Sequence, residues 1–201
     1  MKNFIIYAQI CIGVLLFCSA ADADAFRLQY LLTPIRAKSG VDASTHVEIV
    51  ISGDYSTSEV QFQMPVWSPG DYYVQNHGNY VTAVTVRAGG STKISSAKLG
   101  ALEVTHPNAN TWSVSTAPSQ SFVLSYTLPN TPPGHFSENV SVKDSYAFYN
   151  GAATFMYVVD HKDAPATLSI SVPTGWQSAF TPLPSSASPI KAEHQIGRAH
   201  V

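Results

Sequence analysis

Hydrophobic and polar residues alternate along most of the chain from Phe26 onward, and no stretch shows the three-to-four-residue spacing of an amphipathic helix. Turn-forming pairs such as Gly53-Asp54 and Pro129-Asn130 interrupt the alternation at intervals of about ten residues. This pattern predicts an all-β fold, an antiparallel β-sandwich of the immunoglobulin-like two-sheet type. Strands are expected at residues 45–51, 60–64, 84–87, 102–105, 111–116, 122–128, 154–159 and 167–172.

The segment 64–73 combines a predicted turn with several large rings. Pro69 fixes φ near the value needed at the second position of a tight turn, and Gly70 accepts the positive φ that a type II turn needs next. Trp67, Tyr72 and Tyr73 flank this turn. Such rings either cap the end of a β-core or form a contact surface for a partner.

A second segment of interest surrounds Asn150-Gly151, which lies between the aromatic run 146–149 and the run 152–157. The pair predicts a type I′ hairpin turn. Beside Tyr149, the small residues Gly151 and Ala152 would let another surface approach the backbone closely. An ordinary hairpin with aromatic cross-strand pairs is the alternative interpretation.

The first 25 residues have the features of a secretory signal peptide. Lys2 precedes an apolar run at 4–18, and the small residues of Ala23-x-Ala25 predict cleavage after Ala25, with Ala21-x-Ala23 as the competing site. The mature protein would therefore be exported to the periplasm or the extracellular space. Both cysteines of the chain lie within this segment, so a β-sandwich at 26–183 must be stable without disulfides.

The carboxyl end contains two segments of different character. Residues 184–195 include a Pro/Ser-rich stretch that predicts a linker or the start of a domain junction. Residues 196–201 can be back-translated into a common sequencing-adapter sequence. We therefore expect that 196–201 is an artefact and that the chain is the front part of a longer protein.

Composition and motifs give no sign of chemistry within the chain. The formal net charge is −2, and no basic block indicates nucleic-acid binding. There is no His-Glu-x-x-His, no Gly-x-Ser-x-Gly and no phosphate-binding glycine-rich loop. The seven histidines are scattered along the sequence without metal-ligand spacing. We assign no catalytic residue and no metal ligand, and we expect no cofactor in this part of the protein.

Four ordered segments, 64–72, 110–114, 146–152 and 172–176, resemble the N-terminal domain of the glycyl aminopeptidases, which form metallopeptidase family 61. The resemblance implies a β-sandwich followed by a thermolysin-like catalytic domain and usually a PDZ domain. In such enzymes the zinc ligands and the general-base glutamate belong to the catalytic domain. The chain departs from the family pattern after Tyr73 and at Ser113, where arginines are common in the family. These departures do not change the expected fold, but they weaken the inference that the domain recognises the same substrates as the family.

The resemblance predicts a non-catalytic domain that packs on a zinc-containing catalytic domain and borders its active site, where a peptide substrate is held. The whole protein would be a zinc aminopeptidase, whereas this part alone would have no activity. Candidate contacts with the catalytic domain or the cleft are Trp67, Tyr72, Tyr73, Tyr149, Asn150, Gly151 and Ala152. The alternatives are a free-standing exported module that binds carbohydrate on Trp67, Tyr72, Tyr73 and Tyr80, or a purely structural or adhesive domain.

Overall fold

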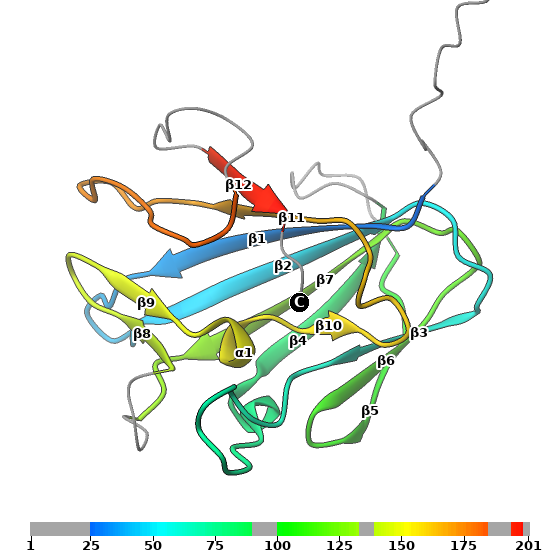
Figure 1. The fold of residues 1–201 in the computed structure, drawn as a ribbon, viewed down its shortest axis with the longest axis horizontal. Helices are drawn as coiled ribbons and strands as arrows, with labels where there is room; N and C mark the ends of the chain where they lie inside the picture. The colour runs from blue at the N-terminus through cyan, green and yellow to red at the C-terminus, as the bar shows by residue number, and fades with distance from the viewer. Residues whose placement is uncertain (1–24, 90–99, 133–138, 185–193, 199–201) are drawn as a thin grey trace, which may run out of the picture.

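The alternating segments form strands throughout the computed structural model, which describes residues 25–89, 100–132, 139–184 and 194–198 (Figure 1). The predicted signal peptide, apart from Ala25, lies outside the described residues. The elements are β1 (Arg27–Ile35), β2 (Ser44–Ser52), β3 (Glu59–Gln63), the 3-10 turn η1 (His77–Tyr80), β4 (Thr82–Ala88), β5 (Val104–Asn108), β6 (Thr111–Ser115), β7 (Phe122–Pro129), β8 (Val140–Val142), β9 (Ala147–Tyr149), α1 (Gly151–Thr154), β10 (Tyr157–Val158), β11 (Ala166–Ile170) and β12 (His194–Arg198).

The strands form a six-stranded sheet in the order β12-β11-β1-β2-β7-β4, a four-stranded sheet in the order β10-β3-β6-β5, and the hairpin β8-β9. Neighbouring strands are antiparallel except for β1 and β11, which run parallel. The predicted all-β sandwich is therefore confirmed, with one parallel pair that the alternation did not predict. Strand β12 extends across the predicted boundary between residues 195 and 196 and pairs with β11.

The two larger sheets meet through the apolar faces of their strands. Strand β1 is not among the strands expected from the sequence; its Leu28, Tyr30 and Leu32 are buried and alternate with more exposed residues. Phe62 of β3 and Phe122 of β7 are both fully buried, and their rings meet edge to face at 6.1 Å between centroids. This contact between strands of different sheets places the hydrophobic core between the two layers.

Two buried tyrosines fix the segment that follows α1 onto the six-stranded sheet. The Tyr30 hydroxyl donates to the carbonyl of Met156 at 2.9 Å. The Tyr126 hydroxyl donates to the carbonyl of Thr154 at 2.7 Å and accepts the Met156 N–H at 3.3 Å. Because residues 154–156 are held by these hydroxyls, the strand predicted at 154–159 is wrong in extent, and only Tyr157–Val158 pairs with β3.

Candidate functional site

The predicted turn at Pro69-Gly70 is confirmed. The Asp71 N–H donates to the carbonyl of Ser68 at 3.1 Å, and Gly70 has a φ of 96°. The rings on either side point outward rather than into the core, since Trp67 is 46% exposed and Tyr72 is 87% exposed. We call residues 66–74 the aromatic turn. A shallow hollow of about 380 Å³ is lined by Val66, Trp67, Tyr72, Tyr73 and Val74.

The predicted type I′ hairpin at Asn150-Gly151 is wrong. Asn150 is extended, with φ −83° and ψ 120°, and its side-chain oxygen accepts the Ala152 N–H as the N-cap of α1. Strand β9 pairs with the preceding strand β8, whereas β10 pairs with β3 in another sheet, so β9 and β10 do not form a hairpin. A type I′ turn needs positive φ at both central residues, and here the capping hydrogen bond of Asn150 prevails instead.

The aromatic turn and the segment 146–152 around Asn150 are far apart in the sequence but are in contact in the structure. The Asn150 side-chain amide donates to the Ser68 hydroxyl at 2.9 Å and to Asn139 Oδ1 at 3.1 Å. The Ser68 hydroxyl also lies 3.0 Å from His77 Nε2 and donates to Gln75 Oε1 at 3.2 Å. We call Ser68, Gln75, His77, Asn139 and Asn150 the polar junction. It joins two of the segments that the sequence proposed as contact surfaces.

The contact between Ser68 and His77 resembles a nucleophile and its base, but its surroundings exclude that role. Ser68 is only 3% exposed, and its hydroxyl is occupied by the Asn150 amide. His77 Nδ1 is buried and has no hydrogen-bond partner among the described residues, so no carboxylate orients the ring. Burial lowers the pKa of His77, and the charge of Asp71 opposes this shift. The hydrogen bonds of the pair hold the turn against the Asn150 side chain.

Sequence reasoning missed Ser68 and His77 as a pair. The notable signal was the position of Ser68 directly before Pro69, because a hydroxyl at the first position of a turn often bonds to neighbouring groups. Nothing in the local pattern indicates that an asparagine 82 positions away also reaches it.

Among the other predicted contact residues, the Tyr149 side chain points into the protein, whereas Gly151 and Ala152 are accessible to solvent. The Tyr149 hydroxyl accepts a hydrogen bond from Thr45 at 3.1 Å, and burial raises the pKa of Tyr149 to about 12. Gly151 is exposed and Ala152 is partly exposed at the start of α1. Of these three residues, the two that are accessible to solvent therefore lie in the first turn of α1.

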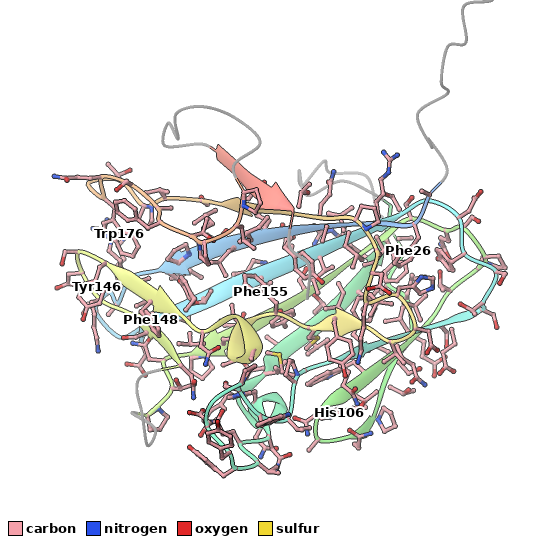
Figure 2. The ribbon with its side chains drawn as sticks, in the orientation of Figure 1. Phe26, His106, Tyr146, Phe148, Phe155 and Trp176 are labelled. Atoms are coloured by element: carbon pink, nitrogen blue, oxygen red, sulfur yellow. The ribbon has the colours of Figure 1, made fainter. Side chains whose placement is uncertain are left out.

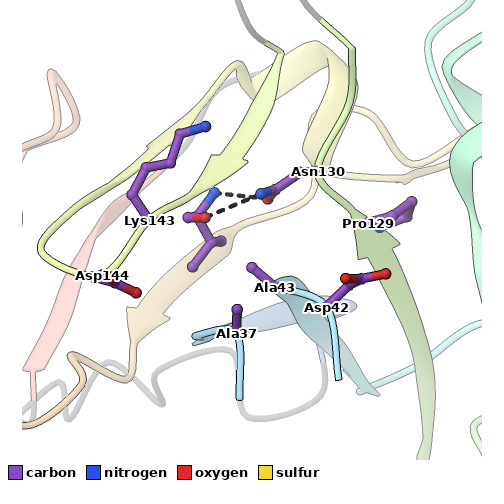
Figure 3. Close-up of a pocket in the computed structure, with 8 residues that line it drawn as sticks. Ala37, Asp42, Ala43, Pro129, Asn130, Lys143 and Asp144 are labelled. Atoms are coloured by element: carbon purple, nitrogen blue, oxygen red, sulfur yellow. Dashed lines mark hydrogen bonds between the residues drawn. The ribbon is translucent and has the colours of Figure 1, made fainter. Parts of the chain in front are cut away.

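A second hollow, of about 540 Å³, lies between the β1–β2 connection and the β8–β9 hairpin (Figure 3). The Asn130 side chain pairs with the backbone of Val142 through hydrogen bonds of 2.8 and 3.0 Å (Figure 3). The hollow is lined by Ala37, Asp42, Ala43, Pro129, Asn130, Val142, Lys143 and Asp144. The lining residues carry charges of both signs, and the Asn130 side-chain amide holds β8 to the end of β7.

Within the described ranges, no three His, Cys, Asp or Glu residues gather closely enough to hold a metal ion. The described side chains therefore do not form a zinc site. The described part of the chain also contains no helix that could span a membrane.

The sequence profile of the Peptidase M61 N-terminal domain matches residues 34–195, which is more than half of the chain. The chain therefore belongs to the Peptidase M61 N-terminal domain family. Among solved structures, it is similar to an aminopeptidase N family protein from Idiomarina loihiensis, with a TM-score of 0.68 and 19% identity. That likeness covers 86% of this chain and 27% of the other, and it supports the shared fold.

A weaker similarity, with a TM-score of 0.37 and 12% identity, relates 73% of the chain to 31% of an M1 zinc metallopeptidase from Deinococcus radiodurans. No curated protein sequence matches significantly. The chain thus spans less than a third of the length of either solved structure.

In this M61 N-terminal domain, three of the four segments that carry the resemblance meet at one place. Asn110 accepts the Met64 N–H at 2.8 Å through its carbonyl and the Gly78 N–H at 3.0 Å through its side chain. A Cβ on Gly78 would lie 2.1 Å from the carbonyl oxygen of Ala109, so only glycine allows this approach. Segments 64–72 and 110–114 are thereby joined, and the polar junction adds segment 146–152.

Proposed function

We propose that this chain is the non-catalytic N-terminal domain of an exported zinc aminopeptidase, and that it packs on the catalytic domain beside the active site. The contact surface consists of the aromatic turn and the exposed start of α1. Its role is to close one side of the cleft, so that the free amino end of a peptide substrate meets a wall. Zinc and the groups that activate water belong to the catalytic domain in this proposal.

The observation that carries the proposal is the hydrogen bond between Ser68 and Asn150. It fastens the aromatic turn to the residue that caps α1. Exposed rings such as Trp67 and Tyr72 are costly to leave in water and are enriched at protein interfaces. The match to the M61 N-terminal domain supports a peptidase as the larger protein.

The experiment begins with the reading frame downstream of Gln195 in the source gene. The whole protein is then produced with Trp67→Ala and Tyr72→Ala together, and hydrolysis of an aminoacyl substrate is measured. We expect kcat/KM to fall at least tenfold, because Trp and Tyr are enriched among interface hot spots, whose truncation costs about 2 kcal/mol or more. Phe180→Ala is the matched control, since Phe180 is 93% exposed and lies outside this surface.

Two results would contradict the proposal. Unchanged kcat/KM in the double variant would remove the aromatic turn from the contact surface. Turnover of an aminoacyl substrate by the 201-residue chain with added zinc would show that the domain is itself catalytic. Export is tested separately by amino-terminal sequencing of the mature protein, which we expect to begin at Phe26.

The apolar hollow in the aromatic turn favours carbohydrate binding as a second candidate function. Planar rings around a shallow hollow suit stacking against sugar faces. Retention of the chain on an insoluble polysaccharide, with loss of retention in Trp67→Ala, would support this alternative over the peptidase role.

A further inference from the structure

In the hairpin β8-β9, the outer backbone groups of β8 form hydrogen bonds, whereas those of β9 have no hydrogen-bond partner among the described residues. In its register, Lys143 donates its N–H to the carbonyl of Tyr146 at 2.8 Å, and Asn150 donates to the carbonyl of Asn139 at 2.7 Å. Along an antiparallel strand, alternate residues direct their backbone groups to opposite sides. Tyr146, Phe148 and Asn150 therefore face β8, whereas Ala147 and Tyr149 direct their N–H and C=O groups away from it.

The outer side of β8 is already occupied. Val140 exchanges hydrogen bonds with Thr131, and the backbone of Val142 is bonded by the Asn130 side chain. By contrast, no described residue pairs with the outward backbone groups of Ala147 and Tyr149. The β9 edge thus presents two donors and two acceptors with the spacing of an extended chain.

Two rings accompany this edge. Tyr146 is 53% exposed and Phe148 is 47% exposed, and Figure 2 shows both at the same end of the molecule as Trp176. The Trp176 indole N–H donates to the carbonyl of Asp144 in the β8–β9 turn at 2.9 Å. An incoming strand would place a side chain opposite Phe148 in a non-hydrogen-bonded pair, where cross-strand side chains come closest.

We propose that the β9 edge binds an extended peptide as an added antiparallel strand, with an apolar side chain beside Phe148. The inference rests on the proposed function, because the peptide would be the substrate of the aminopeptidase. Strand β9 runs toward Asn150, so an antiparallel peptide has its amino end next to the polar junction. The part of the substrate that follows its amino end then lies along β9. The favoured substrates are extended peptides of several residues rather than single aminoacyl groups.

A peptide fits this edge better than a second copy of the chain. Only two residues of β9 offer outward groups, and stable association of two proteins usually requires at least about 1,000 Å² of buried surface. Strand addition gives a short peptide its affinity through main-chain hydrogen bonds and its specificity through alternate side chains.

The test measures amide hydrogen exchange in the 201-residue chain with a hexapeptide of alternating valine and threonine. We expect the peptide to slow exchange at the Ala147 and Tyr149 amides at least fivefold. The Phe148 amide faces β8 and serves as an internal control that should not change. A peptide N-methylated at alternate residues should give no protection, because it lacks the donors that the edge requires.

Variants of Ala147 sharpen the result. Ala147→Pro removes one outward N–H and no bond to β8, and proline is tolerated on edge strands, so we expect peptide binding to weaken at least fivefold. Ala147→Val keeps the N–H and should bind as the parent does. Unchanged exchange at Ala147 and Tyr149 with the unmethylated peptide would overturn the proposal. Protection that rises with protein concentration alone would also overturn it, by assigning the edge to a second copy.

This readout is independent of catalysis. If the whole protein proves not to be an aminopeptidase, exchange at Ala147 and Tyr149 still reports whether the edge binds peptides. If the peptidase role holds, Ala147→Pro should raise KM for a hexapeptide and leave KM for a single aminoacyl substrate unchanged. An equal change for both substrates would place the peptide elsewhere.

Discussion

Tyr126 and Tyr72 carry the same side chain in opposite surroundings. Tyr126 is fully buried, and its hydroxyl bonds to Thr154 and Met156. Tyr72 is 87% exposed on the aromatic turn and has a left-handed φ of 55°. The buried ring accounts for how one segment is fixed to the sheet. The exposed ring contributes little to the fold, and under the proposed function it belongs to the surface that contacts the catalytic domain.

The largest difference between the two regions is expected from truncating a ring in each. Phe62→Ala should lower the free energy of unfolding by about 3–5 kcal/mol, because it removes a fully buried ring and leaves a cavity. Tyr72→Ala should change it by less than about 0.5 kcal/mol, since it removes an exposed side chain. Urea unfolding followed by circular dichroism measures both values. Similar losses in the two variants would show that the aromatic turn is part of the stabilising core.

Removing a single hydroxyl tests the same contrast with a smaller effect. Tyr126→Phe leaves the ring in place but deprives the Thr154 carbonyl and the Met156 N–H of their partner. We expect a loss of about 1–3 kcal/mol in the free energy of unfolding, because buried backbone groups become unsatisfied. Tyr72→Phe is the matched control and should be neutral. A neutral Tyr126→Phe would mean that water reaches the segment 154–156.

The sequence predicts those parts of the fold in which side-chain alternation decides the structure. The strands expected at 122–128 and 60–64 appear as Phe122–Pro129 and Glu59–Gln63. The turn at Pro69-Gly70 was also predicted, because proline and glycine restrict the backbone locally.

The sequence does not predict the features that depend on distant partners. Asn150 could begin a hairpin or cap a helix, and only its contact with Ser68 and the pairing of β9 with β8 decide between them. The single turn of α1 is too short to show helical periodicity. The parallel pairing of β1 with β11 likewise joins segments from opposite ends of the domain.

We expect the polar junction to contribute less to the free energy of unfolding than the core does, and more than the aromatic turn does. Asn150→Ala removes the N-cap of α1 and the hydrogen bond to Ser68, so we expect a loss of about 0.5–2 kcal/mol. Asn79→Ala is the control, because Asn79 is exposed and its side chain makes no hydrogen bond among the described residues. Amide exchange at Ala152 should rise in the Asn150 variant only. Equal stability of the two variants would show that the junction does not hold the turn.

The smallest expected effect is a pH dependence that comes from His77. Burial lowers the pKa of His77 in the folded state from the ordinary value of 6.5, so its ring takes up a proton less readily there. As the pH falls through 6.5, the unfolded chain binds a proton more readily than the folded chain does, so stability is lost. His77→Gln keeps an amide near Ser68 but cannot titrate.

The measurement compares the free energy of unfolding at pH 7.5 and pH 5.5 for the parent chain and His77→Gln. We expect the parent to lose more stability over this interval than the variant does, since the other histidines are the same in both proteins. Glu48 adds no competing signal here. Burial raises its pKa, but hydrogen bonds from His46 and Arg87 and their charges outweigh this and place the pKa below its ordinary value of 4.5. Identical pH dependence in the two proteins would mean that His77 is protonated as easily in the folded chain as in the unfolded one, and that the junction is open to water.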